Sequence, residues 1–163
     1  MNESDNLTAE IFVKSIGALD TLPGTWEVGL DSMKSFLAKE VLIDTSNIRL
    51  ADGSGVSRYN LTSAAQLNSL LRWMYNSKYK DDFISTLPSG GQRNSTLEKR
   101  LTNEGDLVKA KTGGLSGVRN LAGYLKSRKY GDVAFSILMN GYTDSSSRYT
   151  LSLIHISEPT RQL

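Results

Sequence analysis

The feature that most constrains the fold is a change in the spacing of apolar residues near residue 106. Before this point apolar residues recur at steps of three and four, which is typical of amphipathic helices. We expect helices over residues 7–19, 26–40, from 63 onward, 82–87 and 96–101. Beyond it apolar and polar residues alternate, which is the period of a half-buried strand. We expect strands over residues 107–112, 120–126 and 132–140.

Short connections join the three expected strands, such as the segment SGVR at residues 116–119. They favour antiparallel neighbours, because a parallel pair needs a crossover of about a dozen residues or more. The chain has 163 residues, of which 39% are hydrophobic, so it is long enough to bury a core. A helical first part and an antiparallel second part predict an α+β fold with helices packed on the sheet.

The composition excludes several classes of function. The formal net charge is +2 and no run of Lys or Arg exceeds two residues, which argues against a nucleic-acid-binding protein. The chain has one histidine and no cysteine, so a histidine or cysteine metal cluster is excluded. No apolar run approaches the ~18 residues that a transmembrane helix needs.

Two of the expected helices begin with capping signals. Ser63 and Gln66 have the spacing of a capping box, in which each side chain bonds the backbone N–H of the other residue. Asp5 or Asn6 is a suitable N-cap for the first helix. These signals predict where the helices start, whatever else these residues do.

The tripeptide Lys111-Thr112-Gly113 ends the first expected strand. An ammonium and a hydroxyl on a rigid strand can bind a carboxylate, and the glycine lets a ligand approach the backbone. The backbone N–H of Gly114, which follows, is placed to point at a developing oxyanion. Without further context, such a tripeptide is more often a surface turn.

The tripeptide Ser4-Asp5-Asn6 supplies that context. Ser-Asp-Asn and Lys-Thr-Gly, in this order, are two of the three elements of serine β-lactamases and penicillin-binding proteins. Taken alone, the first tripeptide is also explained as the start of a helix. The capping role and the functional role are compatible.

Four separated stretches carry a fuller resemblance: MNESDNLTAE, DGSGVSRYNLTS, FISTLPSGG and KAKTGGLSGVRNLAGYL. With them the chain resembles the low-molecular-mass class C penicillin-binding proteins, which are D-alanyl-D-alanine carboxypeptidase/endopeptidases. The resemblance implies a helix-and-sheet domain like that of the serine β-lactamases. It also implies a serine-type hydrolase that needs no cofactor and acts on peptidoglycan stem peptides ending in D-Ala-D-Ala. β-Lactams would inhibit the full enzyme, and its location would be the periplasm or cell surface.

The resemblance assigns catalytic roles to three residues. Ser4 would relay a proton to the leaving amine, and Asn6 would hydrogen-bond the backbone amide of the substrate. Lys111 would lie near Ser4 and supply positive potential for the carboxylate and for proton transfer.

Three residues would bind the substrate. Thr112 would hold the terminal carboxylate, Gly113 would allow close approach, and the N–H of Gly114 would form half of the oxyanion hole. Members of the family often carry Thr or Ser where this chain has Gly114. A hydroxyl that helps to hold the carboxylate is therefore lost, while the backbone donor remains.

In the loop DGSGVSRYN we expect a mainly structural role for Asp52, Ser54 and Ser57. An aspartate in such a turn bonds nearby backbone N–H groups. Direct contact with substrate is the alternative.

The Ser-x-x-Lys element, which carries the nucleophile, lies upstream of Ser-x-Asn in the family. We expect no serine of this chain to be followed by a lysine three positions later, so we expect the nucleophile to be missing and the chain to be inactive alone. Residues 1–150 would then be the C-terminal part of a penicillin-binding domain. Residues 151–161, LSLIHISEPTR, resemble the translation of a sequencing-library adapter, so 151–163 are expected to be a non-native tail in which His155 has no function.

Two alternatives remain open. One is a β-lactamase-like hydrolase with the same elements. The other is a non-catalytic module that binds peptidoglycan or another carboxylate and has lost the nucleophile.

Overall fold

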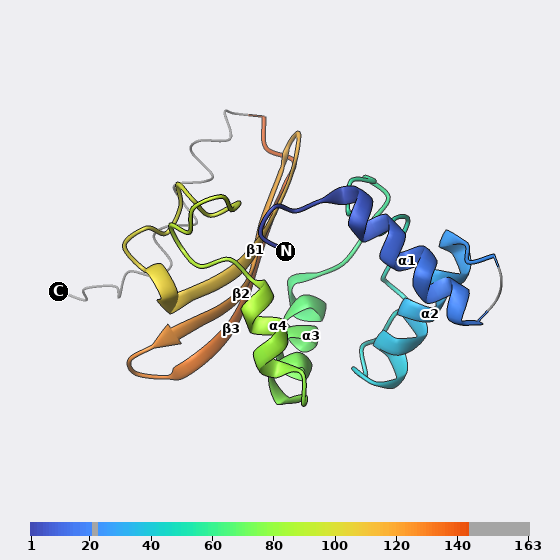
Figure 1. The fold of residues 1–163 in the computed structure, drawn as a ribbon, viewed down its shortest axis with the longest axis horizontal. Coiled ribbons are helices and arrows are strands. Elements are labelled where there is room, and N and C mark those ends of the chain that lie inside the picture. The colour runs from blue at the N-terminus through green and yellow to red at the C-terminus, as the bar shows by residue number, and fades with distance from the viewer. Residues whose placement is uncertain (21–22, 144–163) are drawn as a thin grey trace. The chain divides into compact units, whose positions relative to one another are not determined.

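A computed structural model describes residues 1–20 and 23–143 and divides the chain into two compact units (Figure 1). The helical unit is Ser4–Trp73, and the sheet unit comprises Met1–Glu3 and the described residues from Met74 onward. The expected adapter-like tail at 151–163 lies outside the described residues. Within the described part, no helix is both long enough and apolar enough to cross a membrane.

Four helices are found where the sequence predicts them. They are α1 (Asn6–Asp20), α2 (Trp26–Lys39), α3 (Ala64–Asn76), which ends in the sheet unit, and α4 (Lys80–Thr86). The capping box is confirmed, because Gln66 N donates to Ser63 Oγ at 3.2 Å and Ser63 N donates to Gln66 Oε1 at 2.8 Å. Asp5 also acts as a cap, since its Oδ2 accepts a hydrogen bond of 2.9 Å from Thr8 N.

Helices α1 and α2 pack with their backbones in close contact (Figure 1). Gly29 on α2 faces α1 so closely that an added Cβ would lie 2.0 Å from the carbonyl oxygen of Val13. At Gly24, just before α2, an added Cβ would lie 2.2 Å from Lys14 O. The absence of side chains at these two positions is therefore what sets the distance between the helices.

The rest of the helical unit packs around a cluster of apolar residues. Buried Val41, Ile43 and Ile48 lie in the segment between α2 and α3. The residues packed against them are Leu37, Leu50, Leu70 and Trp73. This cluster fixes the segment between α2 and α3.

The sheet unit contains three strands, β1 (Val108–Leu115), β2 (Val118–Ser127) and β3 (Gly131–Asn140), in the order β1-β2-β3 (Figure 1). Both neighbouring pairs are antiparallel, as the short connections predict. The fold is α+β. The first strand is longer than expected and carries Lys111-Thr112-Gly113 in its interior rather than at its end.

The two faces of the sheet are covered differently. On one face Leu97 and Leu101, from the segment before β1, form a core with Val108, Ala110 and Leu121. On the other face, Phe83 of α4 (Lys80–Thr86) and Tyr75 contact Tyr124, with ring centroids 6.4 and 5.7 Å away. Strand alternation explains this division, because neighbouring residues of a strand point to opposite faces.

The expected short helix over 96–101 is wrong, because the structure has only turns there. Leu101 has a φ of +53°, which a right-handed helix does not allow. The carbonyl oxygens of Leu97 and Arg100 both accept hydrogen bonds from Gly91 N, at 3.0 and 2.9 Å. The apolar residues of this segment are therefore spaced for packing against the sheet and not for forming a helix.

Candidate active site

Four consecutive residues of β1, Lys111 to Gly114, form the centre of the candidate site. Because side chains alternate along a strand, Lys111 and Gly113 face the side of Tyr124. Thr112 and Gly114 face the side that the segment with Leu97 covers. The ammonium of Lys111 and the hydroxyl of Thr112 therefore lie on opposite faces of the sheet, next to each other along β1.

One edge of β1 is open along this stretch. On that edge Ala110 N donates to Pro88 O at 3.1 Å, and an isolated bridge joins Ser89 to Lys109. Among the described residues no strand pairs with β1 beyond that bridge on this edge. Since alternate residues direct their N–H groups to the same edge, those of Thr112 and Gly114 follow Ala110 and point to the open edge.

The ammonium of Lys111 reaches the same edge. Its Nζ donates a hydrogen bond of 2.6 Å to the carbonyl oxygen of Thr112, which points outward with the Thr112 N–H. The residue is partly buried, and burial lowers the pKa of its ammonium below the ordinary value. A partly desolvated cation attracts an anion more strongly than one in open water does.

Ser4 and Asn6 belong to the helical unit. Asn6 is the first residue of α1, and Ser4 is the first residue after the chain leaves the sheet unit. Ser4 has a φ of +56°, the left-handed region, which costs a residue other than glycine about 1 kcal/mol or more. Lys111 lies in the sheet unit, so the roles that pair it with Ser4 and Asn6 stay predictions.

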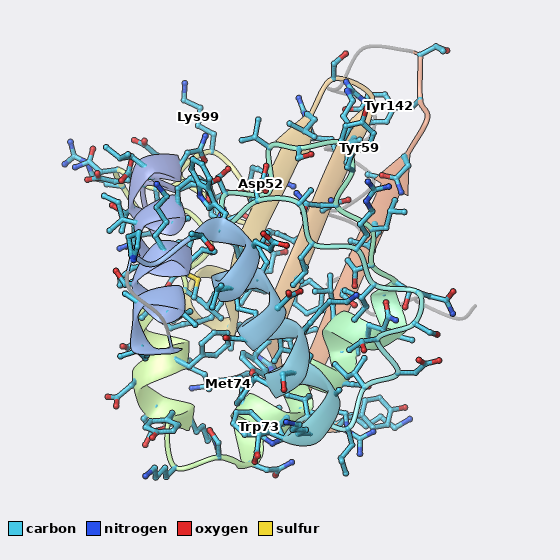
Figure 2. The ribbon with its side chains drawn as sticks, turned by 90° about the vertical axis from the view of Figure 1, so that its right-hand side faces the viewer. Asp52, Tyr59, Trp73, Met74, Lys99 and Tyr142 are labelled. Carbon is cyan, nitrogen blue, oxygen red and sulfur yellow. The ribbon has the colours of Figure 1, made fainter. Side chains whose placement is uncertain are left out.

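The loop DGSGVSRYN is organised by the carboxylate of Asp52 (Figure 2 labels Asp52 and Tyr59 in it). Asp52 accepts hydrogen bonds from Gly55 N at 2.7 Å, Ser57 N at 2.5 Å and Asn60 Nδ2 at 2.7 Å. The expected bonding of this carboxylate to nearby backbone N–H groups is confirmed.

Glu10 on α1 is a residue that the sequence did not single out. Its carboxylate accepts hydrogen bonds from Gly53 N at 3.1 Å and Ser54 N at 2.9 Å, and so ties the loop to α1. The hydrogen bond to the Ser54 side chain is the main cause that lowers the pKa of Glu10. No local signal predicts the contact, because the partners are more than forty positions apart.

A Ser-x-x-Lys spacing does occur in this chain, at Ser77 and Lys80, which corrects the expectation that the motif is missing. Ser77 Oγ donates to Met74 O at 2.8 Å, and Lys80 Nζ lies 3.6 Å from the centroid of the Tyr75 ring. A hydrogen bond to Tyr75 raises the pKa of Lys80, which favours the protonated form. A base that activates serine needs the opposite shift, and the pair follows Ser-x-Asn instead of preceding it. The spacing here fits a helix end rather than a nucleophile.

Comparison with known proteins identifies the family. Residues 1–153 match the model of the D-Ala-D-Ala carboxypeptidase 3 (S13) family. A D-alanyl-D-alanine carboxypeptidase of Actinomadura sp. (strain R39) is 37% identical over 149 residues, which are 88% of this chain and 27% of that protein. The carboxypeptidase DacB of Haemophilus influenzae is 33% identical over 152 residues, covering 88% of this chain and 30% of that protein.

A solved structure has the same fold. The crystal structure of penicillin binding protein 4 from Haemophilus influenzae, complexed with a β-lactam, matches with a TM-score of 0.81 and 31% sequence identity. The match covers 94% of this chain and 37% of that one. The chain thus spans about a third of the length of the relatives that it matches. It belongs to the D-Ala-D-Ala carboxypeptidase 3 (S13) family.

Proposed function

We propose that this chain supplies the carboxylate-binding strand and the Ser-x-Asn element of a serine-type D-Ala-D-Ala carboxypeptidase. Its substrate would be a peptidoglycan stem peptide, cleaved through an acyl-enzyme in the periplasm or at the cell surface. The observation that carries the proposal is the open edge of β1 at Lys111, Thr112 and Gly114. Cleavage of peptide cross-links, an endopeptidase reaction, would use the same site.

The substrate would bind to β1 as an additional strand. An extended peptide gains backbone hydrogen bonds from an open sheet edge. At that edge the Thr112 hydroxyl and the Lys111 ammonium would hold the terminal carboxylate. The Gly114 N–H would stabilise the oxyanion of the tetrahedral intermediate, and such a donor contributes on the order of 10²–10³ in rate.

Ser4 and Asn6 would act on the scissile peptide. Ser4 would pass a proton to the leaving D-alanine amine, and Asn6 would hydrogen-bond a backbone amide of the substrate. The left-handed backbone of Ser4 supports this assignment, because strained residues cluster at active sites.

The serine nucleophile would come from outside residues 1–150, which would form part of a penicillin-binding domain. In the complete site that serine attacks the carbonyl carbon, expels D-alanine and is released by water. β-Lactams would be inhibitors of that complete site.

Titration of the chain with N-acetyl-D-alanyl-D-alanine tests the proposal. We expect the amide NMR signals of Thr112 and Gly114 to shift, because the peptide occupies the edge that they face. The same peptide with a C-terminal amide should bind at least about tenfold more weakly, since its end carries no charge to pair with Lys111. Equal binding of the two peptides, or shifts confined to other parts of the chain, would argue against the proposal.

Incubation with penicillin tests the missing nucleophile. We expect the intact mass of the chain to stay unchanged, because the proposed nucleophile lies outside residues 1–150 and the raised pKa of Lys80 keeps the lysine of the Ser77–Lys80 spacing protonated. Full-length DacB from Haemophilus influenzae treated in parallel serves as the positive control. A mass increase of one penicillin, mapped to a serine of this chain, would contradict the expectation.

A further inference from the structure

We propose that Arg119 binds the terminal carboxylate of the substrate, in place of the hydroxyl that Gly114 does not provide. The inference rests on the proposed function and adds a specificity-determining residue to that site. It begins from the pairing of β1 with β2, in which Gly114 and Arg119 are directly opposite each other.

The guanidinium of Arg119 lies beside Gly114. A Cβ added to Gly114 would be 2.8 Å from Arg119 Nη1 and 3.4 Å from Cζ. Nη1 thus lies close to where the first atom of a serine or threonine side chain would be. The missing side chain at 114 is what gives the arginine access to this position.

Arg119 shares a sheet face with Thr112. Strand alternation puts Thr112 and Gly114 on one face of β1, and cross-strand pairing puts Arg119 on that face of β2. Thr112 and Arg119 are diagonal neighbours, with Cα atoms about 7–8 Å apart in such a pair, within reach of a long side chain. A carboxylate at the Thr112 hydroxyl is therefore within range of the guanidinium.

The arginine is anchored in a way that leaves hydrogen-bonding capacity. Nη1 donates to Leu115 O at 3.1 Å and to Val118 O at 3.0 Å, on either side of the turn between β1 and β2. These two bonds hold the planar group, and in the part of the chain that the structure describes no other partner takes the N–H groups of Nε and Nη2, which leaves them for a ligand. Arginine binds carboxylates with two parallel hydrogen bonds, and Gly114 next to it is exposed.

A second guanidinium makes this face more positive. Burial lowers the pKa of Arg100, and the positive charge of Arg119 lowers it further, which indicates that the two groups are close. Among the described residues, Nε and Nη2 of Arg100 are buried and have no hydrogen-bond partner. An anion held by Arg119 would offset this concentration of charge.

The test compares the carboxylate and amide forms of N-acetyl-D-alanyl-D-alanine on the full chain, by NMR titration. We expect Arg119→Ala to weaken binding of the carboxylate form about tenfold or more and to change binding of the amide form less than about twofold. Arg128→Ala is the matched control, because it removes the same charge from the exposed turn between β2 and β3. It should leave both affinities unchanged.

A rescue variant separates binding from a structural role. In the Arg119→Ala background, Gly114→Thr should restore preference for the carboxylate form, because the hydroxyl returns to the position that Arg119 occupied. Restored preference supports the proposal, and no restoration together with a disturbed NMR spectrum of Arg119→Ala overturns it.

The remaining outcomes distinguish the two proposals. If the unmodified chain prefers the carboxylate form and Arg119→Ala keeps that preference in full, the role of Arg119 is overturned and the proposed function stands. If the unmodified chain does not distinguish the two peptides, both are overturned.

Discussion

Gly29→Ala is expected to destabilise the helical unit by about 3 kcal/mol. An alanine Cβ would lie 2.0 Å from the carbonyl oxygen of Val13, which is backbone and cannot rotate away. The two helices must separate to admit it, and they then lose contact along their length. Helix propensity alone predicts the opposite sign, a gain of about 1 kcal/mol for alanine over glycine.

Urea unfolding, followed by the far-ultraviolet circular dichroism of the helices, measures this effect. Ala38→Gly is the matched control, because it makes the reverse exchange at an exposed position of the same helix. It should cost only the propensity difference of about 1 kcal/mol. A Gly29→Ala variant as stable as the unmodified chain would mean that α1 and α2 do not pack as closely as described.

Lys111→Met is expected to abolish discrimination for a peptide carboxylate, with a loss in affinity of at least about tenfold. We expect the sheet unit to be at least as stable as before. Burial lowers the pKa of Lys111, so the folded state disfavours its charge. Below the pKa of Lys111 in the folded state, the lysine is protonated in both the folded and the unfolded chain, and the full cost of burying its charge lowers the stability. This cost declines as the pH rises from that pKa toward the ordinary value of 10.5. Methionine removes the penalty at neutral pH.

Lys109→Met is the control on the same strand and the same face. Its ammonium donates to Ser89 Oγ at 2.9 Å and lies 3.8 Å from Asp106 Oδ1, so its role is structural. Peptide titration and urea unfolding should separate the two variants. Lys111→Met should lose carboxylate binding and keep its stability, whereas Lys109→Met should lose stability and keep carboxylate binding. Unchanged carboxylate binding in Lys111→Met would remove this lysine from the proposed site.

The parts of the fold that sequence predicts are those with local causes. The change of apolar period near residue 106 separates helices from strands, because each period reflects one-sided burial of one kind of element. The capping box of Ser63 and Gln66 is equally local, since both hydrogen bonds form within one turn. The same alternation predicts the strand that carries Lys111 and Thr112, but it ends that strand before Gly114, which the structure includes in β1.

The parts that sequence does not predict depend on contacts between distant residues. Nothing in the sequence near Glu10 indicates that its carboxylate binds the loop at Gly53 and Ser54. The segment 96–101 has helical spacing, yet the carbonyl oxygens near its end bond to Gly91 N instead. The position of Arg119 beside Gly114 likewise requires the register of two strands, which the separate strand patterns do not specify.

The division of the chain at Trp73 also determines which unit is completed first during synthesis. The helical unit, Ser4–Trp73, is complete in sequence before any strand of the sheet unit has been made. Domains fold as units during translation, N-terminal part first. In the sheet unit, Thr96 N donates to Asn2 O at 3.3 Å, a contact that encloses the whole helical unit as a loop. The ribosome therefore delivers β1, with its open edge, to a chain whose helical unit has already had time to form.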